Sequence, residues 1–199
     1  MTEAGPGWRI LRAADQIATP WKNGGGVTVE IAAAPPGAGL DAFDWRISRA
    51  TVAADGPFSA FPGIDRTLTV LDGDGLLLAV GEAQPVLLAA DGDPFAFPGD
   101  VPAHGQLVGG AVVDLNVMTR RGRVTHALTR VAKGTLLPPL PAGGTIVLVC
   151  TGSALRLHGP DAPSALARHD ALRIDGPIPA WQVDGSGLLV VLTPVSKSA

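Results

Sequence analysis

Glycine and proline recur at short intervals throughout this sequence, and this feature most limits the folds that the chain can adopt. There are 26 glycines and 18 prolines among 199 residues. Both residues interrupt helices, whereas between strands they form turns. Apolar runs of four to eight residues lie between them, at residues 27–33, 45–52, 67–71, 76–80, 86–89, 112–118, 146–150 and 188–193. Many short strands at such spacing are typical of an all-β sandwich or barrel.

Helical patterns are almost absent. Nearly every stretch of eleven residues that could keep a 3.6-residue apolar period is interrupted by glycine or proline. One short helical turn is predicted at residues 13–18. Some predicted strands alternate in polarity: Asp44, Arg46 and Ser48 share one face of a strand, and residues 114–118 alternate in the same way. One face of these strands is partly polar, which predicts a wet pocket inside the protein.

The composition indicates a folded, mildly acidic protein. Hydrophobic residues make up 46% and charged residues 17%, whereas disordered chains combine low hydrophobicity with high net charge. The net charge is −3 and the pI is about 5.7, so no basic excess is present to neutralise phosphates and we expect no nucleic-acid partner. The single cysteine, Cys150, follows an apolar run and is expected to be a buried thiol.

Targeting signals are not evident in the sequence. Residues 1–6 lack a basic region followed by an apolar stretch. Glycines, prolines and charges interrupt every run that could reach the roughly 18 apolar residues needed to cross a membrane. We therefore expect a cytoplasmic protein without a membrane partner.

A weak internal repeat favours a doubled architecture. Residues 71–78 align with residues 150–157, and at the same offset residues 87–91 align with residues 166–170. In both halves the alignment predicts a turn glycine between two strands. A period near 80 residues suits one small barrel repeated, so we expect two tandem barrels.

Three blocks of sequence resemble the HutD/Ves family, in content and in order. The first block reads TPWKNGGGVTVEI, at residues 19–31. The other two consist of residues 45–48 with 56–68, and of residues 94–100 with 114–118. Together they extend over about residues 19–120, and the combination is specific. The second half of the chain resembles the family only loosely.

The resemblance implies a double-cupin (bicupin) fold, which consists of two tandem small β-barrels or jelly rolls. We expect residues 1–125 to form an N-terminal cupin barrel with a ligand pocket, and residues 126–199 to form a C-terminal cupin-like barrel packed with it as one unit. The resemblance also implies a role in bacterial histidine utilisation or its control. Pathway metabolites such as urocanate, formylglutamate or formate are the ligands that it suggests.

The metal site of a metal-dependent cupin is not evident. Such proteins hold a divalent ion with His-x-His, a Glu and a further His. Where His-x-His is expected, this chain has Ile64, Asp65 and Arg66, and an arginine repels a cation. His104 lies about where the last ligand falls, but the first motif supplies no partner histidine. We therefore expect neither a metal nor another cofactor.

Anion recognition is the chemistry that these residues favour instead. Arg46 and Arg66 lie inside the family blocks, and each can hold a carboxylate with two parallel hydrogen bonds. Lys22 can supply a point charge, while Ser48 and Asn23 can add neutral hydrogen bonds. Together they predict a site for a small carboxylic acid. The alternative for each charged residue is a solvated surface position.

Four further residues are candidates for the same pocket. Phe61, beside Pro62-Gly63, can wall it and stack on a planar ligand. Asn116 and Met118 share a strand face, and an interior Asn needs a hydrogen-bond partner that a ligand can provide. Asp65 is a candidate too, although alternation sends it to the face opposite Arg66. Glu30 is expected to pair with Lys22 or Arg46.

The glycine run at residues 24–26 has two readings. We expect a tight turn that enters the strand at residues 27–33, and the alternative is a lip of the ligand pocket. No P-loop pattern accompanies the run, so we do not expect a nucleotide site.

Three functional hypotheses follow. The first is a metal-independent bicupin, not an enzyme, that binds a small carboxylate and senses or buffers a metabolite of histidine degradation, regulating histidine utilisation. The second is a metal-independent isomerase or hydrolase in which Asp65, Glu30 or His104 transfers protons. The third is an interaction protein that pairs through its edge strands. Barrel edges also make a homodimer an expectation that the sequence leaves open.

Overall fold

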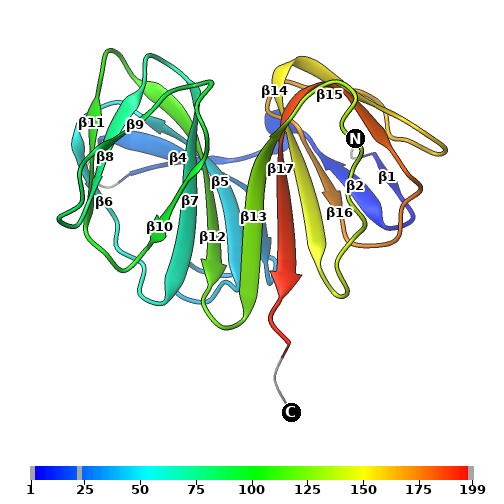
Figure 1. The fold of residues 1–199 in the computed structure, drawn as a ribbon, viewed down its shortest axis with the longest axis horizontal. Coiled ribbons are helices and arrows are strands. Elements are labelled where there is room, and N and C mark those ends of the chain that lie inside the picture. Colours follow the sequence, from blue (N-terminus) through cyan, green and yellow to red (C-terminus); the bar gives the residue numbers. More distant parts are fainter. Residues whose placement is uncertain (1–2, 22–23, 197–199) are drawn as a thin grey trace. The chain divides into compact units, whose positions relative to one another are not determined.

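The computed structural model describes residues 3–21 and 24–196. Within this part of the chain the secondary structure is β-strand, apart from one short 3₁₀ helix, η1 (Ala13–Asp15), at the predicted helical turn (Figure 1). The prediction of an all-β protein is therefore confirmed. The chain divides into a first unit, Ile17–Val124, and a second unit, Met1–Gln16 with Thr125–Ala199. Residues 3–16 thus group with the C-terminal half of the chain, whereas the sequence assigned them to the N-terminal barrel.

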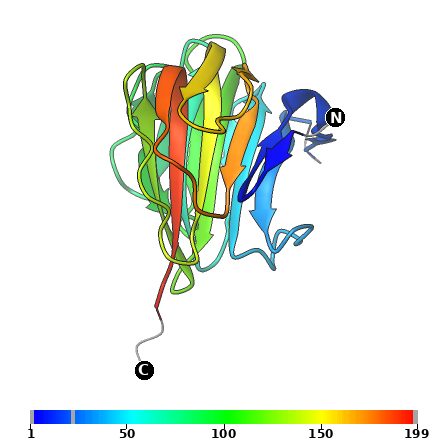
Figure 2. The ribbon, with the colours of Figure 1, turned by 90° about the vertical axis from the view of Figure 1, so that its right-hand side faces the viewer.

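The N-terminal residues join the second unit through a strand pair. Strand β2 (Trp8–Leu11) pairs antiparallel with β16 (Ala171–Ile174), and β1 (Ala4–Gly5) follows at the edge (Figure 2). Ile10 of β2 is fully buried in the core of this unit. Arg12 then binds Asp170 with a distance of 2.8 Å between guanidinium and carboxylate. Burial of an apolar strand face and one partly buried ion pair hold these residues in place.

The first unit consists of two antiparallel sheets. The larger sheet has the order β10-β7-β12-β5-β4-β3 and the smaller one β6-β11-β8-β9. The larger sheet contains β3 (Ala18–Pro20), β4 (Gly26–Ala34), β5 (Trp45–Val52), β7 (Ile64–Asp72), β10 (Phe95–Pro98) and β12 (Val112–Arg120). The smaller sheet contains β6 (Gly56–Phe58), β8 (Leu76–Val80), β9 (Val86–Leu88) and β11 (Ala103–Leu107).

The core of the first unit lies between its two sheets. Val52, Leu68 and Val70 of the larger sheet cluster with Leu76 and Leu78 of the smaller sheet, and all five are buried. Successive residues of a strand point to opposite faces, so every second residue of β5, β7 and β12 contributes to this interior. We call this face of the larger sheet its inner face.

The second unit contains one sheet of order β1-β2-β16-β14-β17-β13, with β15 paired to β14. The strands not yet bounded are β13 (Val124–Val131), β14 (Thr145–His158), β15 (Leu166–Ala167) and β17 (Gln182–Pro194). Its core is apolar and includes the fully buried Trp181, Leu148 and Leu155. The indole nitrogen of Trp181 donates to the carbonyl of Pro160 at 2.8 Å, so this large side chain is buried with its polar atom satisfied.

All eight predicted strands are present, several of them longer than predicted. The turn predicted at Gly152 is wrong. Residues 150–157 lie within the single strand β14, which takes up the extra residues as an irregularity in its pairing with β17 between Cys150 and Leu155. The corresponding Gly73 does form a turn between β7 and β8, with a φ of 99°. A bulge can accommodate surplus residues without ending a strand, and the sequence pattern does not distinguish the two outcomes.

The glycine run connects β3 to β4, as the turn prediction required. The amide of Trp21 donates to the carbonyl of Gly26 at 2.9 Å, and the amide of Gly24 donates to the carbonyl of Trp21 at 3.1 Å. Gly24 has a φ of 72°, a conformation that side chains disfavour. A Cβ on Gly26 would lie 2.4 Å from the carbonyl oxygen of Thr51. Both glycines are therefore required by the backbone.

Candidate functional site

Polar side chains gather on the inner face of the larger sheet of the first unit. The register places Met118 opposite both Arg46 and Arg66. Two residues before Met118 on β12, Asn116 lies opposite Ser48. Asp114 lies two residues before Asn116 on the same strand. Residues opposite one another share a face, so these side chains and the apolar core point to the same interior. The inner polar cluster comprises Arg46, Ser48, Arg66, Asp114 and Asn116.

Arg46 lies where this interior meets solvent. Its Nε atom donates to Oε2 of Glu30 at 2.8 Å, and its Nη1 atom lies 3.4 Å from Oγ of Ser48. The side chain of Arg46 is 12% exposed and that of Glu30 is 40% exposed. The predicted pairing of Glu30 with Arg46 is confirmed. A ligand entering here would meet a guanidinium whose orientation is already held by two partners.

Arg66 is buried, at 3% exposure. Its guanidinium lies 5.0 to 5.5 Å from the ring centres of Phe58, Phe61 and Phe97, which favours a cation. Nη1 donates to the carbonyl of Ser59 at 3.1 Å, but Nε has no partner among the described residues. Burial lowers the pKa of Arg66 to about 10, although Asp114 opposes this shift. The side chain therefore remains a cation at neutral pH.

Asp114 is the buried carboxylate of the cluster, at 1% exposure. Neither of its oxygens has a hydrogen-bond partner among the described residues, and the same holds for Oδ1 of Asn116. Burial raises the pKa of Asp114 to about 7. The charge of Arg66 and the nearby amide of Ala50 act in the opposite direction and lower it. The amide of Ala50 does not reach hydrogen-bond geometry. Unpaired buried polar atoms are rare in folded proteins and call for an explanation.

The other predicted site residues divide into three groups. Phe61 and Met118 pack in one apolar cluster with Ile64. Phe61 also lies against the guanidinium of Arg66, so both side chains border the inner polar cluster. Asp65 points to the other face, where the guanidinium of Arg121 binds it at 2.7 Å. Lys22 and Asn23 lie outside the described residues.

His104 does not face this interior. It lies on β11 between the buried Ala103 and Gly105, and its side chain is exposed. Alternation along β11 therefore directs it outward. In the described part of the chain, no three His, Cys, Asp or Glu side chains gather in a way that could hold a metal ion.

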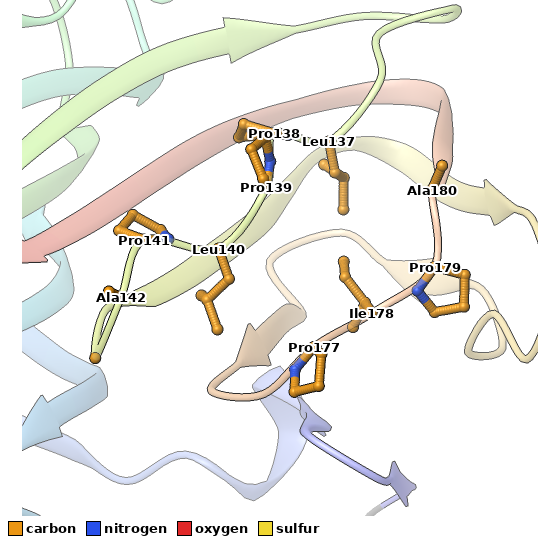
Figure 3. Close-up of a pocket in the computed structure, with 11 residues that line it drawn as sticks. Leu137, Pro138, Pro139, Leu140, Pro141, Ala142, Pro177, Ile178, Pro179 and Ala180 are labelled. Atoms are coloured by element: carbon orange, nitrogen blue, oxygen red, sulfur yellow. The ribbon is translucent and has the colours of Figure 1, made fainter.

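A pocket in the second unit has a different chemistry. It has a volume of about 560 Å³ and is lined by residues 137–143 and 177–180 (Figure 3). The lining includes Leu137, Leu140 and Ile178 together with five prolines. Proline has no backbone N–H, and no charged side chain lines the groove. It therefore lacks the cationic side chains that the inner polar cluster offers to a carboxylate.

The family is shown by a match over most of the chain. The family model described as HutD matches residues 13–191. This chain is a member of the HutD family. The predicted resemblance is thereby confirmed, and it extends through the second half, where the sequence blocks were weak. The HutD family is linked to histidine utilisation.

Two relatives and one solved structure are similar to this HutD-family chain. An uncharacterised 21.2 kDa protein from the hutC 3′ region of Pseudomonas putida is 46% identical to this chain. The alignment covers 55% of this chain and 57% of the relative. Protein Ves of Cronobacter sakazakii is 40% identical over 67% of this chain and 71% of its own length. HutD from Pseudomonas fluorescens SBW25, in a formate condition, has a TM-score of 0.84 and 32% identity, covering 95% of this chain and 100% of that one.

More distant structures show the fold alone. Vicilin from hazelnut, Corylus avellana, matches with a TM-score of 0.56 at 8% identity, over 94% of this chain and 85% of its own. The HutD-family chain thus has a double-cupin fold, as predicted. Its described residues include no helix of the length and apolarity that crossing a membrane requires.

Sequence reasoning missed Asp114, although the signal was present. The run of residues 114–118 alternates, so Asp114 shares a face with Asn116 and Met118, which were both selected. Its burial and its unpaired oxygens follow from the packing of the two sheets, and no feature of the local sequence indicates them.

Proposed function

We propose that this HutD-family protein binds a small carboxylate metabolite in its first unit, without a metal ion, and that it senses or buffers a product of histidine degradation. The observation that carries the proposal is the pair of guanidinium groups, Arg46 and Arg66, on one inner sheet face opposite Met118. Two cations on a partly buried face attract an anion more strongly than the same charges in water.

The two arginines differ in a way that suits a binding site. Arg46 is partly exposed and already held by Glu30 and Ser48. Arg66 is buried and keeps Nε unpaired among the described residues. A carboxylate between them would gain charge-assisted hydrogen bonds and satisfy the buried donor. Ser48, at 2% exposure, offers a neutral hydroxyl beside Arg46.

The family link supplies the class of metabolite. Histidine degradation produces acids such as urocanate and formylglutamate, and the relative from Pseudomonas fluorescens was obtained in a formate condition. A protein that binds one such acid can report its level or limit its free concentration. Regulation of histidine utilisation is the role that we propose for that binding.

A metal-independent enzyme is the weaker candidate. Its expected proton carriers are dispersed: Asp65 pairs with Arg121 on the other face, and His104 is exposed on β11. Glu30 pairs with Arg46. General acid-base catalysis needs a group within hydrogen-bond reach of the bound substrate, and these three residues do not surround one interior.

The test is ligand-dependent stability. Thermal unfolding would be followed with urocanate, formylglutamate, formiminoglutamate, formate and histidine, each with and without a chelator. An acid at a hundredfold excess over its dissociation constant raises the free energy of unfolding by about 2.7 kcal/mol. We expect such a shift for at least one acid, unchanged by the chelator and lost in Arg46→Gln and Arg66→Met.

Arg123→Gln is the matched control for the loss of an arginine. Arg123 pairs with Asp44, and its side chain is 65% exposed. This variant should keep the full ligand-induced shift. If no acid shifts the unfolding of the wild type, or if Arg46→Gln responds as the wild type does, carboxylate binding at this cluster is refuted. Turnover of a bound acid would favour the enzyme instead.

A further inference from the structure

Two acceptor side chains inside the first unit have no donor among the described residues. Both oxygens of Asp114 and Oδ1 of Asn116 are buried and unpaired. They lie on the same strand, two residues apart, and point to the same face as Arg46 and Arg66. A cluster that binds only a carboxylate needs donors alone, so these acceptors are unexplained by the proposed function.

An ion pair with Arg66 does not account for Asp114. The guanidinium of Arg66 donates instead to the carbonyl of Ser59 and lies among three phenylalanine rings. The two charges act on each other through space, but no hydrogen bond joins them. A buried carboxylate kept only for structure is normally bonded to its partner, because an unpaired one carries its full desolvation cost.

We propose that Asp114 and Asn116 determine ligand specificity by accepting hydrogen bonds from an N–H group of the bound acid. This inference rests on the proposed function, since the carboxylate of the ligand is taken to lie at Arg46 and Arg66. The ligand class becomes small acids that also carry nitrogen, such as imidazole, amide or amidine acids. An acid without N–H leaves both acceptors unpaired and binds more weakly.

The spacing along the strands fits ligands of this size. Met118 marks the level of the two arginines, Asn116 lies two residues away, and Asp114 two residues further. Two residues of a strand span roughly 7 Å. A ligand with its carboxylate at the arginines therefore places a donor a few bonds away at the level of Asn116, and a longer ligand extends toward Asp114.

The test compares two acids of the same shape. Imidazole-4-acetate and furan-2-acetate share a five-membered ring and an acid arm, but only the first carries a ring N–H. Calorimetric titration of the wild type should show at least tenfold tighter binding of the imidazole acid. In Asp114→Leu and in Asn116→Leu, which remove an acceptor and retain bulk, that preference should fall below threefold. Asp65→Asn, on the opposite face, is the matched control and should retain it.

The outcomes separate this inference from the proposed function. If furan-2-acetate binds the wild type as tightly as the imidazole acid, or if Asp114→Leu keeps the preference, the acceptor role is overturned while carboxylate binding stands. The role is also overturned if only acids without N–H bind. If no acid of either panel binds, the proposed function fails and this inference fails with it.

A second measurement needs no variant to fold. The ¹⁵N and ring-proton NMR signals of ¹⁵N-labelled imidazole-4-acetate bound to the wild type report the hydrogen bond directly. We expect a ring N–H proton that exchanges slowly with water and moves downfield. Ring signals that match those of the free acid at saturation would overturn the inference.

Discussion

Among the residues that the structure describes, each unit buries one aspartate, and the two are held in opposite ways. Asp170 of the second unit is 4% exposed and accepts hydrogen bonds from the amides of Ala13 and Ala167 and from Arg12, at 2.8 to 3.1 Å. Asp114 of the first unit is 1% exposed and accepts none within the described residues. Burial alone raises the pKa of either carboxyl, but the bonds to Asp170 lower its pKa overall, whereas that of Asp114 rises to about 7.

The difference separates a structural carboxylate from a candidate binding group. Asp170 connects the N-terminal residues to the sheet of the second unit, whose hydrophobic core is built of apolar side chains and Cys150. The first unit instead places two arginines, a serine, an asparagine and an aspartate against its apolar core. Buried polar groups that have no hydrogen-bond partner are typical of functional sites. We therefore expect changes at the unpaired Asp114 and at the hydrogen-bonded Asp170 to have different effects on stability.

The largest effect is expected from removal of the buried cation. Arg66→Met at pH 8 leaves Asp114 without its opposing charge and removes the contacts with three aromatic rings. We expect the free energy of unfolding, measured by urea denaturation, to fall by about 3 kcal/mol. Adding Asp114→Leu should restore at least half of that loss, because the folded state then no longer buries a carboxyl whose pKa Arg66 had lowered. A double variant no more stable than Arg66→Met would show that the two charges are not coupled.

The pH dependence of stability should differ in sign between the two aspartates. The pKa of Asp114 is raised from 3.8 to about 7, so between these values the folded state holds a proton that the unfolded state has released. The stability of the wild type therefore falls as the pH rises through this window, by about 2 kcal/mol from pH 5 to pH 7 relative to Asp114→Asn. Urea denaturation of both proteins across this range measures the difference.

Asp170→Asn provides the contrast in the same experiment. Because the pKa of Asp170 is lowered, its contribution is present above its ordinary pKa and is lost as the pH falls below it. The penalty of Asp170→Asn should therefore be constant from pH 5 to pH 7. A wild-type stability that does not change relative to Asp114→Asn over this range would contradict the buried, unsatisfied state of Asp114.

How far the sequence predicts this molecule depends on which interactions are local. Strand positions followed from apolar runs between glycines and prolines, and the shared strand face of Arg46 and Ser48 followed from alternation. The burial of Arg66 among Phe58, Phe61 and Phe97 did not, because Phe97 belongs to β10, about 30 residues further along the chain, and only folding brings it to Arg66. The same holds for β2: its pairing with β16 joins segments about 160 residues apart, and no local pattern encodes it.

The smallest effect concerns Asp65, which the sequence assigned to the pocket. It lies on the outer side of β7, and Arg121 binds both Asp65 and Asp100 at 2.7 and 3.0 Å. The three side chains are 38% to 49% exposed, so solvent screens the pairs and each contributes little to stability. Asp65→Asn should lower the free energy of unfolding only slightly, with the effect diminishing in high salt. Its affinity for any acid that binds the wild type should remain within twofold. A larger loss of affinity would bring Asp65 back into the site and would show that the polar interior of the first unit extends beyond its inner sheet face.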